Sequence, residues 1–321
     1  APETTEKTDP SGESWKEDEE LKLYGTADQD VDEEGKVRAA SSYDLDTVIS
    51  QTVSWKRGTS DNTVFTADFL NNVSSTASDW TVLFLGRLGI AEDYNAFLNR
   101  ASAYVKDLYD KNPSTGLSTN TPTEWHRLTM AVLAAGGDPT DVGGHDLIAD
   151  GTYNCLAGAP WEQGMNGAAW ALLALDSKGY EVPEKAKYTR EDLISYILGK
   201  ELSGGGWSLD DKNPSLDLDI TSMVVYALAP HAAEDAKVRE AVNRGLDVLR
   251  SKISTDGDYN YGGTYNCESV AQAIIAFTSM GIEPATVTNA SSGKSLLDGL
   301  LKYYSTGTGG FLHAYHDDEK Q

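Results

Sequence analysis

Five strongly apolar segments recur along the chain, and they constrain its fold more than any other feature. Each begins with polar or acidic residues and continues through aromatic, aliphatic and small residues. A helix that is hydrophobic on nearly all sides is buried. The segments start roughly 40–50 residues apart, a spacing typical of helical repeats. We therefore expect five buried helices, at residues 79–89, 123–136, 164–176, 217–230 and 266–281.

Amphipathic segments alternate with the apolar ones. In the clearest of them, Val238, Val242 and Leu249 form one apolar stripe while the opposite face is charged. Buried helices that alternate with amphipathic helices predict an all-α fold with two concentric layers, an α/α toroid. The expected outer helices are residues 44–55, 92–109, 144–149, 189–198, 234–251 and 294–304.

This pattern leaves the ring one inner helix short. A sixth inner helix is expected after Gly309-Gly310-Phe311, but the sequence ends at Gln321. Either the sequence stops before a sixth inner helix, or the ring is open, or another segment fills that position. Residues 256–263 are rich in Gly, Asp and Asn and predict a loop or a small hairpin. The expected helix N-caps include Asp79, Thr123 and Asp219.

The first 40 residues differ from the rest in composition. They are polar and acidic, and such a segment buries too little apolar surface to fold alone. We expect residues 1–40 to form a flexible arm and residues 41–321 to form a single toroid domain. The start at Ala1 is typical of the mature end of an exported protein, which predicts an extracellular or cell-surface location.

The chain carries a formal net charge of −24 and has an isoelectric point near 4.4. That charge argues against binding to nucleic acid and to anionic membrane surfaces, because both select positive patches. No apolar run approaches the ~18 residues of a membrane span, so we expect no membrane insertion. We expect a monomer.

The two cysteines, Cys155 and Cys267, occur in the same Thr-Tyr-Asn-Cys context. Neither belongs to a CxxC pair or has a His at metal-ligand spacing, so no metal site is expected. Two buried free thiols are the favoured interpretation, because free Cys behaves as a small hydrophobic residue. A disulfide in an oxidising compartment is the alternative.

Two glycine-rich turns end in an aromatic residue. Residues 201–207 read Glu-Leu-Ser-Gly-Gly-Gly-Trp, and residues 305–311 end in Gly-Gly-Phe. These turns resemble the repeat of the prenyltransferase and squalene-cyclase superfamily, in which a Gln precedes a Gly-x-Trp. Glu201 stands in the position of that Gln, and Phe311 replaces the second Trp. The resemblance covers residues 44–313 and implies an α/α toroid.

More narrowly, the chain is similar to uncharacterised exported bacterial toroids, which resemble the helical domain of transcobalamin. This resemblance implies an architecture and export, but it implies no activity. The segments that carry it are residues 123–127, 163–167, 217–223 and 268–272.

One motif matches part of a catalytic motif of that superfamily. Class II terpene cyclases protonate an alkene with the middle Asp of Asp-x-Asp-Asp-Thr, and a neutral Asp in an apolar cavity suits that chemistry. Asp217, Asp219 and Thr221 match three of its positions, whereas Ile220 replaces the third Asp. We favour helix capping by Asp219 and Thr221, with Asp217 bonded to a neighbouring loop.

The N-terminal ends of the inner helices share one rim in a toroid. Two carboxylates that flank a cleft are the arrangement of glycoside hydrolysis, but capping and the helix dipole also place acids at these ends. The acids expected at this rim are Glu124, Asp217, Asp219 and Glu268. The other candidate ligand-binding residues are Trp80, Trp125, His126, Asn166 and Trp170.

We interpret the sequence as an exported binding or surface-interaction module with a rim pocket for a small or hydrophobic ligand. The alternative is an enzyme, either carbohydrate-cleaving or a degenerate class II terpene cyclase. No cofactor is assigned. The catalytic candidates under that alternative are Glu124, Asp217, Asp219 and Glu268.

Overall fold

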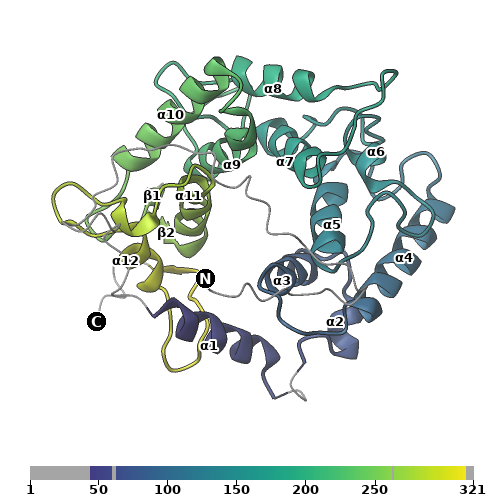
Figure 1. Cartoon of the computed structure of the whole chain (residues 1–321), viewed down its shortest axis with the longest axis horizontal. Coiled ribbons are helices and arrows are strands. Elements are labelled where there is room, and N and C mark those ends of the chain that lie inside the picture. The colour runs from purple at the N-terminus through teal and green to yellow at the C-terminus, as the bar shows by residue number, and fades with distance from the viewer. Residues whose placement is uncertain (1–43, 60–62, 262–263, 316–321) are drawn as a thin grey trace, which may run out of the picture.

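Five helices follow one another around the middle of the molecule (Figure 1). The computed structural model describes residues 44–59, 63–261 and 264–315. Along the chain, each of the five packs against the next. They coincide closely with the five predicted buried helices. They are α3 (Thr76–Arg87), α5 (Thr123–Ala134), α7 (Gly164–Asp176), α9 (Leu218–Leu228) and α11 (Cys267–Ser279).

The remaining helices lie outside these five (Figure 1). All six predicted amphipathic segments contain one of them, so the prediction of an all-α fold is confirmed. The short α2 was not predicted. These helices are α1 (Leu45–Arg57), α2 (Ala67–Asn71), α4 (Tyr94–Lys111), α6 (Leu147–Gly151), α8 (Arg190–Gly199), α10 (Ala236–Ser251) and α12 (Leu296–Leu301). Two 3-10 turns are η2 (Ala229–His231) and η3 (Pro284–Thr286).

A small antiparallel sheet precedes α11. β1 (Asn260–Tyr261) pairs with β2 (Thr264–Asn266), as the predicted hairpin requires. β3 (Ala314–Tyr315) adds to the other edge of β2, with Asn266 opposite Ala314. The sheet therefore brings the segment after α12 back beside the start of α11. This return was not predicted, because strand pairs of two residues leave no periodic pattern in a sequence.

One turn geometry occurs three times and ends each time in a largely buried aromatic residue. In each copy the backbone N–H of the residue that opens the turn donates to a carbonyl four or five residues later along the chain. Two copies coincide with the glycine-rich turns of the sequence. The copy at 254–259 was missed because Asp258 and Tyr259 replace Gly and Trp. The bonds are Leu202 to Gly206 (2.9 Å), Ser254 to Asp258 (2.7 Å) and Ser305 to Gly310 (2.8 Å).

These turns connect successive outer helices. Each follows one outer helix and is held by a side chain of the next, which lies further around the molecule. After α12 the next outer helix is α1, so the last turn joins the two ends of the outer layer (Figure 1). The bonds are Arg244 of α10 to Glu201 (2.7 Å), Lys302 of α12 to Asp258 (2.7 Å) and Thr52 of α1 to the Gly309 carbonyl (3.0 Å).

The N-cap positions in the structure lie one to four residues before the predicted ones. The cap of α3 is Ser75, and Asp79 lies inside the helix. Thr123 is the first residue of α5, whose N-cap position is Pro122. The cap of α9 is Asp217, whose carboxylate accepts from the backbone N–H of Ile220 at 2.9 Å. Capping by Asp219 was therefore wrong, because a cap must precede the first helical residue.

Two groups of buried side chains form the core. One lies among the elements from α1 to α6 and the other among those from α7 to α12. Helices α5 and α7 pack against each other where the two groups meet. The expectation of one domain over residues 41–321 remains a prediction, and the expected arm at residues 1–40 lies outside the described residues.

A pair of neighbouring glycines tests the importance of these turns. Gly206 has a φ of +77°, and a Cβ there would lie 2.6 Å from Leu216 Cδ1. The conformational strain and the overlap predict that Gly206→Ala lowers the free energy of unfolding by about 1–3 kcal/mol. Gly204 has open space around a Cβ, so Gly204→Ala is the control and is expected to change stability by less than about 0.5 kcal/mol. Urea denaturation measures both, and equal stabilities of the two variants would contradict this role.

Candidate functional site

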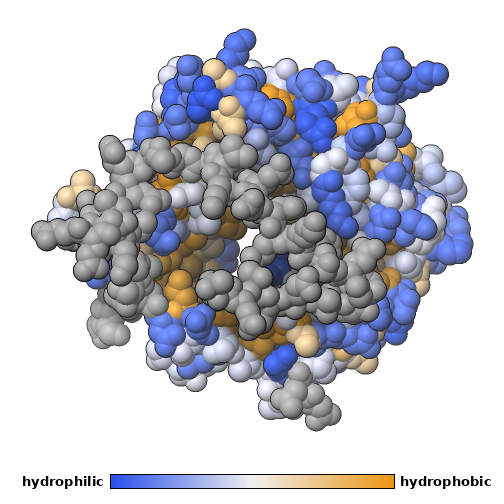
Figure 2. Space-filling view, viewed as in Figure 1, coloured by the Kyte–Doolittle hydropathy of each residue, from blue (hydrophilic) through white to orange (hydrophobic). Residues whose placement is uncertain are grey.

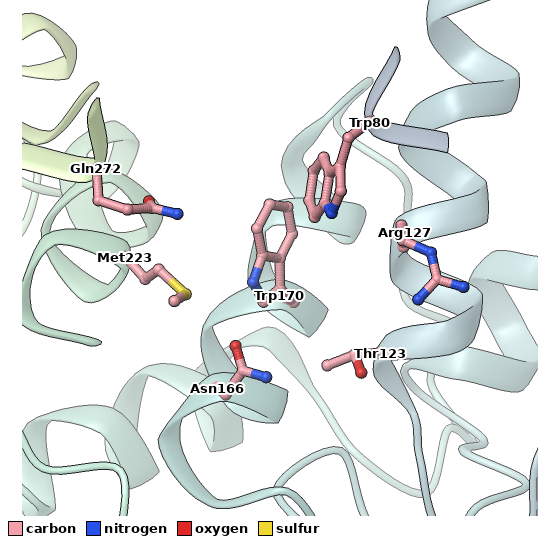
Figure 3. A pocket seen from close by; sticks show the side chains of 7 residues that line it. All are labelled: Trp80, Thr123, Arg127, Asn166, Trp170, Met223 and Gln272. Atoms are coloured by element: carbon pink, nitrogen blue, oxygen red, sulfur yellow. The ribbon is translucent and has the colours of Figure 1, made fainter. Parts of the chain in front are cut away.

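A pocket of about 250 Å³ lies at the centre of the five inner helices (Figure 3). Figure 2 shows that the face in view is hollowed near its centre, with hydrophobic residues visible to the left of the hollow and below it. Every inner helix contributes at least one side chain to the pocket. The lining residues are Trp80 of α3, Thr123 and Arg127 of α5, Asn166 and Trp170 of α7, Met223 of α9 and Gln272 of α11.

A spacing of four residues explains which side chains reach the pocket. Residues four apart on a helix lie on the same face, and Thr123 and Arg127 line the pocket together. Trp80, Asn166 and Trp170 were predicted as site residues, whereas Thr123, Arg127, Met223 and Gln272 were not. The spacing from the rim residues was the available signal. Asn166 and Trp170 on α7 form a second lining pair, whereas Met223 and Gln272 lie four residues after Asp219 and Glu268, which do not line the pocket.

The aromatic residues of the pocket contact one another. The ring centroids of Trp80 and Trp170 lie 5.1 Å apart with the planes inclined at 54°. Tyr226 approaches Trp170 edge-on, with the centroids 6.3 Å apart. Trp80 keeps 37% of its surface exposed. The two indoles therefore present apolar ring faces, inclined to each other, that a ligand is able to contact.

The structure does not place Trp125 with these aromatic residues. Its side chain is fully buried, and its indole N–H donates to the hydroxyl of Tyr109 at 2.8 Å. Trp125 precedes the pocket residue Arg127 by two positions, which is about 200° around a helix. It is therefore a core residue on the side of α5 that faces away from the pocket. Trp80 and Trp170, which begin or enter their helices in a similar way, face the pocket instead.

His126 is also buried in the core. Its Nε2 lies 2.7 Å from the Gly151 carbonyl and donates to it. Burial lowers the pKa of His126 to about 4, so the imidazole is neutral near pH 7. Its expected position at the rim was wrong, because α6 covers this side of α5.

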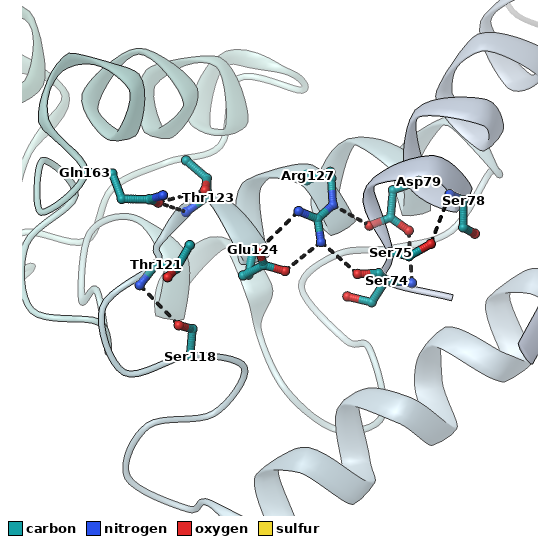
Figure 4. A network of polar contacts seen from close by, with 10 residues as sticks. All are labelled: Ser74, Ser75, Ser78, Asp79, Ser118, Thr121, Thr123, Glu124, Arg127 and Gln163. Carbon is teal, nitrogen blue, oxygen red and sulfur yellow. Dashed lines mark hydrogen bonds and ion pairs between the residues drawn. The ribbon is translucent and has the colours of Figure 1, made fainter. Parts of the chain in front are cut away.

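Arg127 joins α3 to α5 through a partly buried ionic network (Figure 4). Its guanidinium donates to Asp79 at 2.9 Å and to Glu124 at 2.6 Å. A third bond, at 2.7 Å, reaches the carbonyl of Ser74, a residue with a φ of +64°. Glu124 is therefore occupied by an ion pair. Arg127, the only charged residue that lines the described pocket, is thus paired with two carboxylates.

Asp79 is the buried member of this network. Burial raises the pKa of Asp79 to about 6, although hydrogen bonds from Arg127 and the Ser74 backbone oppose the shift. The carboxyl is thus ionised at neutral pH and pairs with the guanidinium.

Helix α5 begins without a side-chain cap on Pro122. Gln163, which precedes α7, instead accepts from the backbone N–H of Thr123 at 3.0 Å.

The other predicted rim acids gather at the start of α9 and α11. Burial raises the pKa of Asp219; a hydrogen bond with Ser269 lowers it, and the carboxylates of Asp217 and Glu268 raise it. One carboxylate oxygen of Asp219 is buried and has no partner among the described residues. Glu268 lies 2.9 Å from Nδ1 of His313. Within residues 44–315, as far as they are described, none of these acids lines the pocket at the centre.

Both cysteines are free thiols, and Cys155 is buried. Burial raises the pKa of Cys155 to about 11 and that of Cys267 to about 12.

Among the described residues, no three His, Cys, Asp or Glu side chains gather at one metal-binding position. No helix in the described part of the chain combines the length and the apolar character that crossing a membrane requires.

Comparisons with protein families, with curated proteins and with solved structures find no match to this chain. The residues and their geometry are therefore the basis of the functional argument.

Asp219 predicts a pH-dependent stability. A carboxyl whose pKa is higher in the folded state stabilises the fold fully below its unfolded pKa, about 4, and loses that contribution as pH rises through the folded value. We therefore expect Asp219→Asn to be more stable than the parent at pH 7, and we expect this advantage to shrink towards pH 4. Urea denaturation across this range measures the difference.

Asp217 provides the matched control. Asn caps helices about as well as Asp, so Asp217→Asn is expected to change stability little, whereas Asp217→Ala is expected to lose about 1 kcal/mol. A loss of stability in Asp219→Asn at pH 7 would show that the bond with Ser269 outweighs the burial of the carboxylate.

Proposed function

We propose that this chain is an α/α toroid that binds a small ligand with a hydrophobic surface in its central pocket. Three observations support the toroid. The inner helices pack in sequence from α3 to α11. The turns connect successive outer helices from α8 to α1. All five inner helices line one pocket.

The proposed toroid has an opening in its inner layer between α11 and α3. Both flanking helices carry large hydrophobic side chains that are exposed, with Ile275 of α11 at 49% and Trp80 of α3 at 37%. No sixth inner helix follows α12 within the residues described up to 315. Within the described residues, the proposed toroid therefore has the five inner helices that the alternation in the sequence predicts.

The pocket carries the proposal of ligand binding. A concave site with aromatic walls and a few polar groups is the usual form of a small-molecule site. Trp80 and Trp170 supply the aromatic wall, and Asn166 and Gln272 supply polar groups beside it. The exported or cell-surface role that the resemblance to exported toroids implies is kept as part of this proposal.

A neutral apolar dye and the removal of one indole test the proposal. We expect N-phenyl-1-naphthylamine to gain fluorescence with the parent protein, because the dye fits the apolar wall. Trp80→Ala is expected to weaken this binding at least tenfold, since a stacked aromatic contact contributes on the order of 1 kcal/mol beyond its buried area. Mass spectrometry of organic extracts of the purified parent protein identifies any native ligand. Such a ligand is expected to displace the dye.

Trp55 provides the control. It is 45% exposed on α1 and does not line the pocket, so Trp55→Ala is expected to keep dye binding. Thermal unfolding checks that the variants are folded. Equal loss of binding in Trp55→Ala and Trp80→Ala, or no binding by the parent, would contradict a ligand site in the centre.

A further inference from the structure

The pocket walls combine apolar surface with uncharged polar groups. Two indoles and a thioether, from Trp80, Trp170 and Met223, provide the apolar part. Two amides and a hydroxyl, from Asn166, Gln272 and Thr123, provide the polar part. The remaining lining group, Arg127, is paired with two carboxylates that do not themselves line the pocket. The wall therefore presents no unpaired charge, and an ionised ligand would lose hydration without gaining a free counter-ion.

The polar groups have hydrogen-bonding capacity left for a ligand. The amide of Asn166 makes no hydrogen bond within the described part of the chain, so it offers both donors and an acceptor. The amide oxygen of Gln272 accepts from Tyr226 at 3.1 Å, which leaves its NH2 group as a donor. Thr123 donates its hydroxyl proton to Gln163 at 2.7 Å and keeps acceptor capacity. A pure hydrocarbon ligand would leave these groups without partners, so a ligand with hydroxyl groups is favoured.

The positions of these groups match a small hydroxylated ring. Figure 3 shows the amide of Gln272 to the left of Trp170 and the amide of Asn166 below it, with Thr123 and Arg127 to the right. In the proposed complex an indole contacts the C–H face of such a ring, while the amides and the hydroxyl pair with hydroxyl groups around its edge. The volume of about 250 Å³ has room for one such ring.

We propose that the central pocket binds one neutral saccharide ring through Trp80 and Trp170, with Asn166 and Gln272 pairing with its hydroxyl groups. This inference rests on the proposed function, because it names the ligand class of the same pocket. The ring is either a free monosaccharide or the terminal unit of a glycan chain. Both present the same C–H face and hydroxyl edge.

Calorimetric titration of the full chain with neutral monosaccharides and with matching oligosaccharides tests the proposal. Binding of a monosaccharide identifies the free sugar, and binding of oligosaccharides alone identifies a chain terminus. Glucosamine and glucuronic acid, which carry opposite charges, are expected to bind at least tenfold more weakly than the matched neutral sugar. Equal or tighter binding of a charged analogue would overturn the neutral assignment.

Asn166→Leu separates saccharide binding from general apolar binding. Leu has nearly the shape of Asn but no hydrogen-bonding group, so we expect saccharide binding to weaken at least tenfold while the binding of N-phenyl-1-naphthylamine is kept. Asn99→Leu, at an exposed position of α4, is the matched control and is expected to bind both probes like the parent. Thermal unfolding of each variant verifies folding.

The two probes distinguish the failure of this inference from that of the proposed function. Dye binding that requires Trp80, together with no saccharide binding at the highest soluble concentrations, would overturn the saccharide proposal and keep the pocket. Saccharide binding that Asn166→Leu leaves unchanged would also overturn it. If neither probe binds, both proposals fail.

Discussion

The turn at residues 202–207, which ends in the buried Trp207, positions much of the structure around it. The backbone N–H of Trp207 donates to the hydroxyl of Thr221 at 3.0 Å, and the Trp207 indole N–H donates to the Ile197 carbonyl at 2.8 Å. One residue thus fixes the end of α8 relative to the start of α9. Similar turns at 254–259 and 305–311 contact α12 and α1. The contacts between the turns and the outer helices hold the framework around the inner helices. The polar side chains of the inner helices that line the pocket take no part in these contacts.

Arg127 performs a second positioning role on the opposite side of the pocket. Its bonds to Asp79 and Ser74 connect α3 to α5, and Glu124 and Asp79 both pair with it. Partly buried charges are tolerated when they are paired and hydrogen-bonded. The network therefore places a guanidinium beside Trp80 without giving the pocket an unpaired charge. This is why the pocket chemistry favours a neutral ligand in a protein whose formal net charge is −24.

Helical phase explains which site residues were predictable. Asn166 and Trp170 are four residues apart and line the pocket, and Trp80 joins them. Trp125 and His126 occupy similar repeat positions, but their phase on α5 turns them into the core. The acids Asp217 and Glu268 lie at helix starts as predicted, yet they serve as a cap and as the partner of His313. Residue type alone does not distinguish a lumen-facing position from its neighbours, because a difference of one residue is about 100° on a helix.

The sequence by itself determined the helices, their order and the alternation of buried with amphipathic segments. These follow from local periodicity and from glycines, which act within a few residues. Only the tertiary structure decided that β3 returns to α11, that residues 254–259 form a third turn, and that Gln163 caps α5 from another segment. It also decided that the pocket includes Met223 and Gln272. The physical reason is that hydrogen bonds and a shared pocket between distant segments depend on where the helices pack, and packing has no signal in any single segment.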